Sequence, residues 1–234
     1  MLTAVSTEAL PLDRRQRRRL ETIEEVLDVA LEVMTEQGVA GLSVGEVARR
    51  MGIRPPSLYV YFPSKHALYD ALFQRGAAAV RDVIESSVRV DPKRSLATTL
   101  QEAAELLVRW AIDNPAYTQM LFWRPVPGFE PSAAAYAASV EMSEFSIHQF
   151  RALQDLGLLR SDVPAQDIFR DWTILCSGVI SQQLANGPDD TFESGAFTRA
   201  LPSIVAMFAT YYGATANPPS SPRTQKERSR ERTR

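Results

Sequence analysis

The residues whose types and spacing could carry a specific chemistry lie between positions 47 and 61 of this sequence. Val47 and Met51 on one predicted short helix and Leu58 on the next are spaced to pack the two helices together. The other side chains of the second helix then face solvent, where they can reach phosphates and base edges of DNA. These outward-facing residues are Arg54, Pro55, Ser57, Tyr59 and Tyr61.

Two short helices must position these side chains. Ser43 and Glu46 have the spacing of a capping box and predict a helix that runs through Met51 and ends at Gly52. Pro55 suits the first turn of a second helix of about seven residues, which ends near Phe62. Two short helices separated by a glycine turn form a helix-turn-helix, whose second helix can enter a major groove about 12 Å wide.

Apolar residues at steps of three and four predict helices on both sides of this pair. The first covers about residues 15–37 and stops at Gly38, the usual place of a C-terminal glycine. The others cover 64–87, 95–114, 115–123, 132–156, 164–186 and 197–212. No alternating strand pattern or hairpin turn is evident, so the predicted fold class is all-α.

Residues 20–73 resemble the TetR/AcrR family of bacterial transcriptional regulators. The resemblance rests on G-V-x-G-L-S-V-x-x-V-A-x-x-M-G-I at 38–53 and L-Y-V-Y-F-P-S-K-x-A-L at 58–68. It implies a homodimer with an N-terminal three-helix helix-turn-helix domain, followed by a larger helical domain for ligand binding and dimerisation. It also implies that a small molecule bound there weakens DNA binding. We therefore expect a repressor released from its operator by a small, largely apolar ligand, with an activator as the open alternative.

The resemblance also assigns DNA-contacting roles. Ser43 matches the start of the second helix, where backbone and hydroxyl groups meet phosphate, and Lys65 matches the basic residue that opens the fourth helix and pairs with phosphate. Residues 54–57 correspond to the start of the recognition helix. Tyr59 and Tyr61 match aromatic and polar positions that contact backbone or base.

Two positions depart from the family pattern. Gly45 and Pro55 stand where some relatives carry base-reading polar side chains. Base readout is therefore expected to depend on Arg54, Ser57 and Tyr61.

Charge is unevenly distributed along the chain, whose formal net charge is −2. Five arginines lie between Arg14 and Arg19, and six basic residues accompany two acidic ones from Asn217 onward. The arginines can be interpreted as a DNA-binding arm ahead of the first helix or as a solubilising, flexible terminus. The same alternatives stay open for the tail. The predicted organisation is a disordered N-terminus (1–13), the helix-turn-helix domain (14–65), the ligand-binding and dimerisation domain (66–213) and a disordered basic tail (214–234).

The larger domain is rich in aromatic side chains. They are compatible with an ordinary core, but they would also suit a cavity for a mainly apolar ligand. The candidate pocket residues are Arg109, Trp110, Phe122, Trp123, Phe145, His148 and Trp172.

The last two predicted helices, 164–186 and 197–212, mix small and apolar residues, a pattern that permits close helix packing. By the family resemblance they form the dimer interface, which is expected to include Ile180 and Val205. Cys176 is expected to be a small buried group and not a redox sensor, since nothing near it in sequence would lower the pKa of a thiol.

Other classes of protein are less well supported by the residues. Hydrophobic residues make up 45% of the 234 residues, enough for a core, and no apolar run reaches the roughly 18 residues of a membrane span. There is no phosphate-binding glycine loop, GxSxG or HExxH motif, so we predict no enzyme, cofactor or metal. A helical scaffold would leave the exposed Arg54, Tyr59 and Tyr61 unexplained. The chain has one cysteine, and its N-terminal basic cluster follows the apolar residues instead of preceding them as in a signal peptide. A cytoplasmic location is therefore expected.

Overall fold

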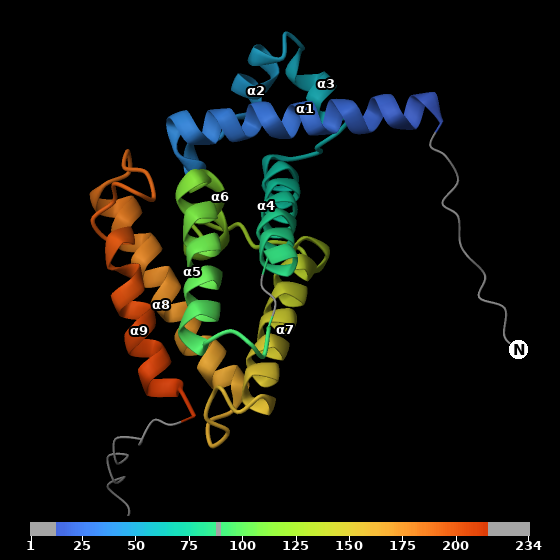
Figure 1. Cartoon of the computed structure of the whole chain (residues 1–234). Coiled ribbons are helices and arrows are strands. Elements are labelled where there is room, and N and C mark those ends of the chain that lie inside the picture. Colours follow the sequence, from blue (N-terminus) through green and yellow to red (C-terminus); the bar gives the residue numbers. More distant parts are fainter. Residues whose placement is uncertain (1–12, 88–89, 215–234) are drawn as a thin grey trace, which may run out of the picture. The chain divides into compact units, whose positions relative to one another are not determined.

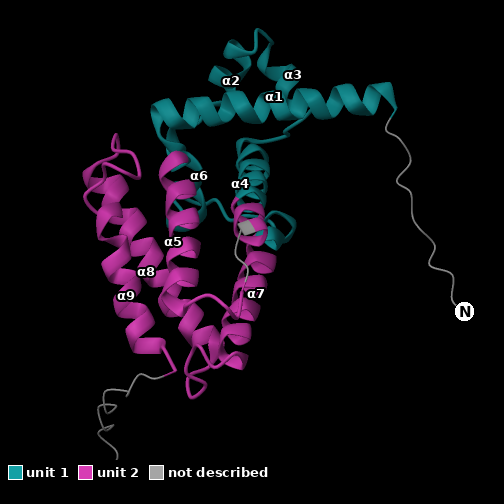
Figure 2. Ribbon diagram, viewed as in Figure 1, with its two compact units in different colours: residues 1–79, 114–138 teal, residues 80–113, 139–234 magenta. Residues whose placement is uncertain are grey.

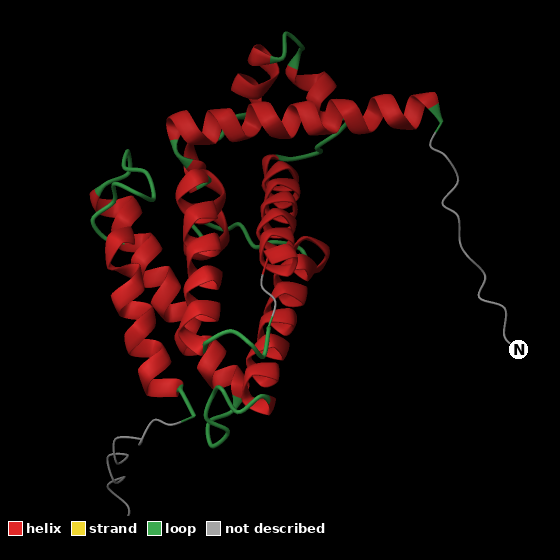
Figure 3. Ribbon diagram, in the orientation of Figure 1, coloured by secondary structure: helices red, strands yellow, loops and turns green. Residues whose placement is uncertain are grey.

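The computed structural model describes residues 13–87 and 90–214 of the chain. Within these ranges it is built of helices and contains no strand, only an isolated bridge between Leu159 and Gly213 (Figure 3). The prediction of an all-α fold is confirmed. The helices are α1 (Arg14–Gln37), α2 (Val44–Arg50), α3 (Pro55–Tyr59), α4 (Lys65–Ser87), α5 (Leu96–Asp113), α6 (Pro115–Trp123), α7 (Ala133–Asp155), α8 (Ala165–Asn186) and α9 (Leu201–Tyr212), with short 3-10 helices η1 (Val39–Gly41) and η2 (Thr198–Ala200) (Figure 1).

Local sequence signals fix the ends of the first helix. The Asp13 carboxylate accepts a hydrogen bond from the Gln16 backbone at 2.7 Å, and the Gln16 side chain accepts one from the Asp13 backbone at 3.0 Å. This capping box satisfies two free amides and makes Arg14 the first helical residue. The helix ends at Gly38, whose φ of +78° is a conformation that glycine adopts without steric cost.

The structure corrects three local expectations. The helix that starts at Pro55 ends at Tyr59 and not near Phe62, since the residues up to Tyr61 continue it only as a turn, in which the Tyr61 and Phe62 amides both donate to the Leu58 carbonyl at 3.0 Å. The arginines, interpreted as a DNA-binding arm or a flexible terminus ahead of the first helix, instead form its first turns, since Asp13 caps the chain before them. The Ser43–Glu46 capping box is half formed: Ser43 Oγ accepts from the Glu46 amide at 3.4 Å, but the Glu46 carboxylate binds arginines.

The chain divides into two compact units (Figure 2). The first contains residues up to 79 together with 114–138, and the second contains 80–113 and the residues from 139 onward. These two units do not coincide with the two predicted functional domains, whose boundary between residues 65 and 66 stays a prediction. The predicted disorder of residues 1–13 and 214–234 falls outside the described residues except at its two inner ends, where Asp13 caps α1 and the Ala214 amide donates to the Leu158 carbonyl at 3.1 Å.

The first unit is assembled around α1, which packs against α2 and α6, while α2 packs against α3. The start of α4 is fixed to η1 by Tyr69, whose buried hydroxyl donates to the Val39 carbonyl at 2.7 Å. Further along α4, Arg75 donates to the Tyr117 hydroxyl of α6 at 2.6 Å and to the Asp28 carboxylate of α1 at 2.7 Å. One guanidinium thus joins three helices of this unit.

In the second unit α5, α8 and α9 pack pairwise against one another. Aromatic rings form part of this core: the centroids of Trp172 and Phe208 are 5.2 Å apart, and those of Phe208 and Tyr212 are 4.6 Å apart. Ile180 and Val205, expected at a dimer interface, are each 1% exposed and belong to this core. That expectation was wrong because the helical repeat shows which residues share a face, but not whether that face meets the same subunit or a partner.

Candidate nucleic-acid interface

The helix α3 is short and is held in place by a single deeply buried side chain. Leu58 is 0% exposed, as is Val47 of the neighbouring α2. Arg54 is the N-cap residue in an extended conformation, and its carbonyl accepts from the Ser57 amide at 2.9 Å. Leu58 thereby anchors one side of α3 and leaves its other sides to solvent.

The predicted contact residues of α3 lie on those solvent-facing sides. Arg54, Pro55 and Ser57 are exposed, and Tyr59 is 47% exposed. Arg54 forms no ion pair with any other described residue, so its five N–H donors are available to a ligand. The arrangement offers a cation and a small hydroxyl at the start of the helix and a phenol at its end.

Tyr61 follows α3 and is only half-buried. The guanidinium carbon of Arg19 lies 5.2 Å from the centroid of its ring, a cation–π contact between α1 and the residues after α3. Tyr61 therefore does not point freely outward as predicted. This contact spans 42 positions of sequence, and no local pattern could have revealed it.

Ser43 and Lys65, both predicted to contact phosphate, each also have a hydrogen-bond partner within the protein. The exposed Ser43 caps α2 through its hydroxyl. Lys65 Nζ donates to the Ala40 carbonyl at 3.3 Å and lies 5.4 Å from the centre of the Tyr69 ring. An ammonium has three donors, so two remain for an anion.

Opposite charges hold α2 on α1. Arg50 donates from Nη1 to the Glu36 carboxylate of α1 at 2.9 Å and from Nε to the Glu46 carboxylate at 2.8 Å. Hydrogen bonds from Arg49, and then from Arg50, lower the pKa of Glu46 to about 2. The Glu36–Arg50 pair joins residues 14 positions apart and was not predicted.

The seven predicted ligand-pocket residues do not lie in one compact unit. Phe122 and Trp123 belong to the first unit, and the other five belong to the second. Trp172 is buried in the aromatic core, Trp110 and Phe145 are half-buried, and His148 is exposed. Arg109 forms an ion pair with Glu193 and lies 4.1 Å from the ring centroid of Phe192.

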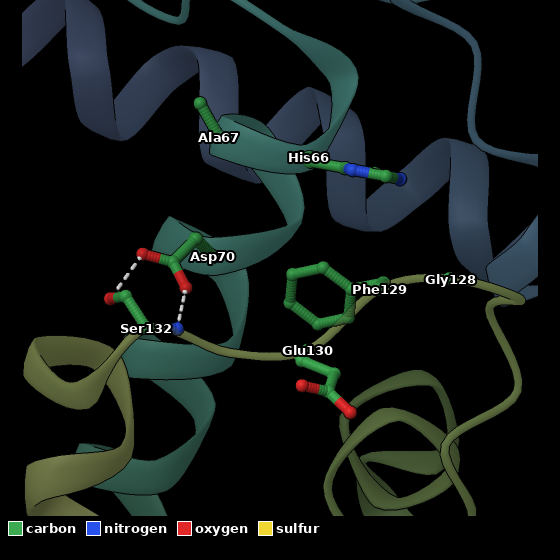
Figure 4. Close-up of a pocket in the computed structure, with 7 residues that line it drawn as sticks. All are labelled: His66, Ala67, Asp70, Gly128, Phe129, Glu130 and Ser132. Atoms are coloured by element: carbon green, nitrogen blue, oxygen red, sulfur yellow. Dashed lines mark hydrogen bonds between the residues drawn. The ribbon is translucent and has the colours of Figure 1, made fainter.

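An open pocket of about 590 Å³ lies in the first unit, at the start of α4 (Figure 4). Asp70 occupies one side, where its carboxylate accepts from the backbone amide and the hydroxyl of Ser132, both at 2.7 Å. The Phe129 ring lies 6.0 Å from the ring of His66. None of the seven predicted ligand residues lines this pocket, whose members are His66, Ala67, Asp70, Gly128, Phe129, Glu130 and Ser132.

The described residues offer neither a group of metal ligands nor a membrane-spanning helix. No three His, Cys, Asp or Glu side chains in this part of the chain are grouped so that they could hold a metal ion. No helix there combines the length and hydropathy that crossing a membrane requires.

Comparison with known proteins places the helix-turn-helix in a family. Residues 26–72 match the model of bacterial regulatory proteins of the tetR family, and this range contains all seven predicted DNA contacts. The chain is 31% identical over 96 residues to YobS of Bacillus subtilis, named as an uncharacterized HTH-type transcriptional regulator. The helix-turn-helix segment is that of the TetR family. The match covers 41% of this chain and 49% of YobS, so the chain spans about half the length of this curated relative.

Other proteins named for TetR resemble the chain over different parts. The class D tetracycline repressor of Escherichia coli is 45% identical over 49 residues, which cover 21% of this chain and 22% of that protein. The solved structure of PfmR, a TetR family transcriptional regulator of Thermus thermophilus, is 18% identical. It matches 79% of this chain and 96% of its own with a TM-score of 0.62, which extends the shared TetR fold beyond the helix-turn-helix.

Proposed function

We propose that this chain is a sequence-specific DNA-binding repressor of transcription. The observation that carries the proposal is α3, a short helix anchored by one buried leucine, with Arg54, Ser57 and Tyr59 exposed, inside the segment that matches the family model. Exposed donors at the start of a short helix can reach base edges in a major groove. Lys65 and Ser43 supply donors for phosphates on either side and contribute affinity without sequence preference.

The proposed regulator binds its operator as a homodimer through α8 and α9. The core-facing residues of these helices are used within the subunit, but their outer faces carry large apolar side chains. Ile174 and Met207 are each 64% exposed, and small exposed residues lie one turn from them, Gly178 on α8 and Ser203 on α9. Small residues beside large apolar ones allow two helix pairs to approach closely.

A small, largely apolar molecule is proposed to release the protein from its operator. We place its site within residues 95–186, where half-buried aromatic side chains such as Trp110 and Phe145 could rearrange around a ligand. The tetracycline repressor, as its name states, represses and is associated with a small molecule. Hydrophobic compounds that raise the unfolding temperature and dissociate the DNA complex would support this mechanism. Compounds that bind only outside residues 95–186 would contradict it.

The experiment that tests the proposal is selection of bound sequences from a random DNA pool with the purified protein. A dimer predicts an enriched inverted repeat whose half-sites are separated by about one turn of DNA, roughly 10 base pairs, or a multiple of it. An enzyme or a protein-binding scaffold predicts no enrichment. A pool that stays random after repeated rounds would overturn the proposed function.

A further inference from the structure

The start of α1 carries an unusual concentration of positive charge. Five of its first six residues are arginines, and all of them are exposed. The Asp13 capping box makes this segment helical, so the guanidinium groups are displayed from a rigid element. We call Arg14, Arg15, Arg17 and Arg18 the basic start of α1.

This placement is electrostatically unfavourable for the protein alone. The N-terminal end of a helix carries a partial positive charge that favours acidic residues, yet the first turn of α1 contains none. Arginines four apart, such as Arg14 and Arg18, also repel each other. None of the four forms an ion pair with a carboxylate of the described residues. Folding stability therefore gives no reason for these charges.

The other end of the same helix provides an internal comparison. Glu36 lies in the last turn, where a negative charge is also unfavourable, but it is paired with Arg50 of α2. At that end a contact within the fold explains the reversed charge. At the N-terminal end no carboxylate of the described residues pairs with the arginines, so they are free to bind an anion from outside the chain.

The position of the basic start of α1 indicates which anion. Arg19, the next residue, lies over the ring of Tyr61, immediately after α3. Figure 1 shows the N-terminal turns of α1 continuing past α3 within the first unit. A duplex that receives α3 in its major groove would place its flanking phosphates within reach of this end of α1. Arginine suits that contact because its planar fork can bind two phosphate oxygens at once.

We infer that the basic start of α1 is a second DNA-contacting surface, which binds backbone phosphates outside the segment read by α3. The inference rests on the proposed function and adds a contact that extends the footprint on each flank of the operator. Bound phosphate also neutralises charges that otherwise oppose the helix dipole. The contact increases affinity for operator and unrelated DNA alike, since phosphates carry no direct sequence information.

The test compares two variants that each lose two positive charges. In Arg14→Gln/Arg18→Gln the charges come from the basic start of α1, and in Lys93→Gln/Arg151→Gln they come from exposed positions of the second unit. Binding to a selected operator and to a scrambled duplex is measured at several salt concentrations. The first variant should bind both duplexes more weakly, with a salt slope shallower by about two units per subunit, and the control should match the wild type. The unfolding temperature of Arg14→Gln/Arg18→Gln should equal or exceed that of the wild type, because repulsion between positive charges at the start of α1 is relieved.

Duplex length provides an independent readout. Trimming the flanks of the operator should weaken the wild type but leave the Arg14→Gln/Arg18→Gln variant almost unchanged. A wild-type salt slope in that variant, with operator binding intact, would overturn the inference while leaving the proposed function standing. Loss of binding to vesicles of anionic lipid without any change on DNA would overturn it as well, in favour of a membrane surface. If the wild type selects no operator, the proposed function itself fails.

Discussion

At the residue scale, Glu46 links the two ends of the short helix α2. Its backbone amide is capped by Ser43, and its carboxylate accepts hydrogen bonds from Arg49 at 2.8 Å and from Arg50 at 2.8 Å. Arg50 in turn reaches Glu36 of α1, so the carboxylate of Glu46 orients the guanidinium that fastens α2 to α1. A proton on Glu46 would remove this support.

The Glu46 pKa predicts a dependence of stability on acid. The arginines lower this pKa from 4.5 to about 2, so the stabilisation is complete above about pH 4.5 and is lost as the pH falls towards 2. Glu46→Gln should lower the urea midpoint of unfolding at neutral pH. It should also make this midpoint fall less steeply between about pH 4.5 and 2. Urea unfolding followed by circular dichroism from neutral to acidic pH measures both effects. Glu144→Gln, at an exposed position of α7, should keep the wild-type decline, and an equal flattening in that control would contradict the assignment.

Single residues were predictable where their environment is set by nearby sequence. Leu58 and Val47 are buried as their helical spacing requires. Cys176 is buried as expected, and burial raises the pKa of its thiol to about 12, which keeps it protonated at neutral pH. The Arg19–Tyr61 and Arg50–Glu36 contacts were not predictable, because their partners come from different helices and meet only after the fold has formed.

At the scale of elements, the packing of α4 against α6 depends on a glycine. A Cβ atom on Gly76 would lie 2.5 Å from a ring carbon of Tyr117, closer than real Cβ contacts allow. The Tyr117 ring has little freedom to move away, since it is buried and its hydroxyl accepts from Arg75. Gly76 therefore permits a close approach of two helices in the first unit.

Gly76→Ala should destabilise the protein, although alanine normally favours a helix by about 1 kcal/mol over glycine. The steric conflict should outweigh that gain, since overpacking a core costs about 1–3 kcal/mol. Thermal and urea unfolding give the net change. Gly45→Ala in α2 is the matched control, because its nearest neighbour would be Ser43 Oγ at an ordinary 3.7 Å. The control should be neutral or stabilising, and a stabilised Gly76→Ala would show that α4 and α6 are packed less closely than described.

Element boundaries followed from sequence more reliably than element faces. Caps, glycines and prolines located most helix ends within a few residues, since these signals act locally. The length of α3 was overestimated because the residues after Tyr59 form a turn, in which the Tyr61 and Phe62 amides share the Leu58 carbonyl. Which apolar face of α8 or α9 is internal could not be predicted, because both faces of these helices carry apolar residues. Only tertiary packing determines that Ile180 is buried and Ile174 is exposed.

At the scale of the whole molecule, the proposed dimer makes a prediction that separates interface from core. Ile174→Asp/Met207→Asp changes two apolar side chains that are each 64% exposed, so the subunit should stay folded. If α8 and α9 form the interface, two buried charges per subunit should dissociate the dimer and weaken operator binding. Sedimentation velocity and circular dichroism measure association and folding separately.

Val140→Asp is the control for this variant, since Val140 is an exposed apolar residue of α7 outside the proposed interface. It should remain dimeric. An unaltered dimer in the Ile174→Asp/Met207→Asp variant would place the interface elsewhere. A monomeric Val140→Asp control would also place the interface elsewhere.

The central claim, that the start of α3 reads bases while the start of α4 holds phosphate, is tested most directly by titrating two variants on operator and scrambled DNA over a range of salt. Lys65→Gln keeps a donor for the Ala40 carbonyl but removes the charge. It should weaken binding to both duplexes alike, with a salt slope shallower by about one unit per subunit. Ser57→Ala should lose about 1–3 kcal/mol on the operator, bind scrambled DNA as the wild type does, and relax the preference at particular base pairs. A change of sequence preference in Lys65→Gln, with Ser57→Ala leaving the preference intact, would contradict the account.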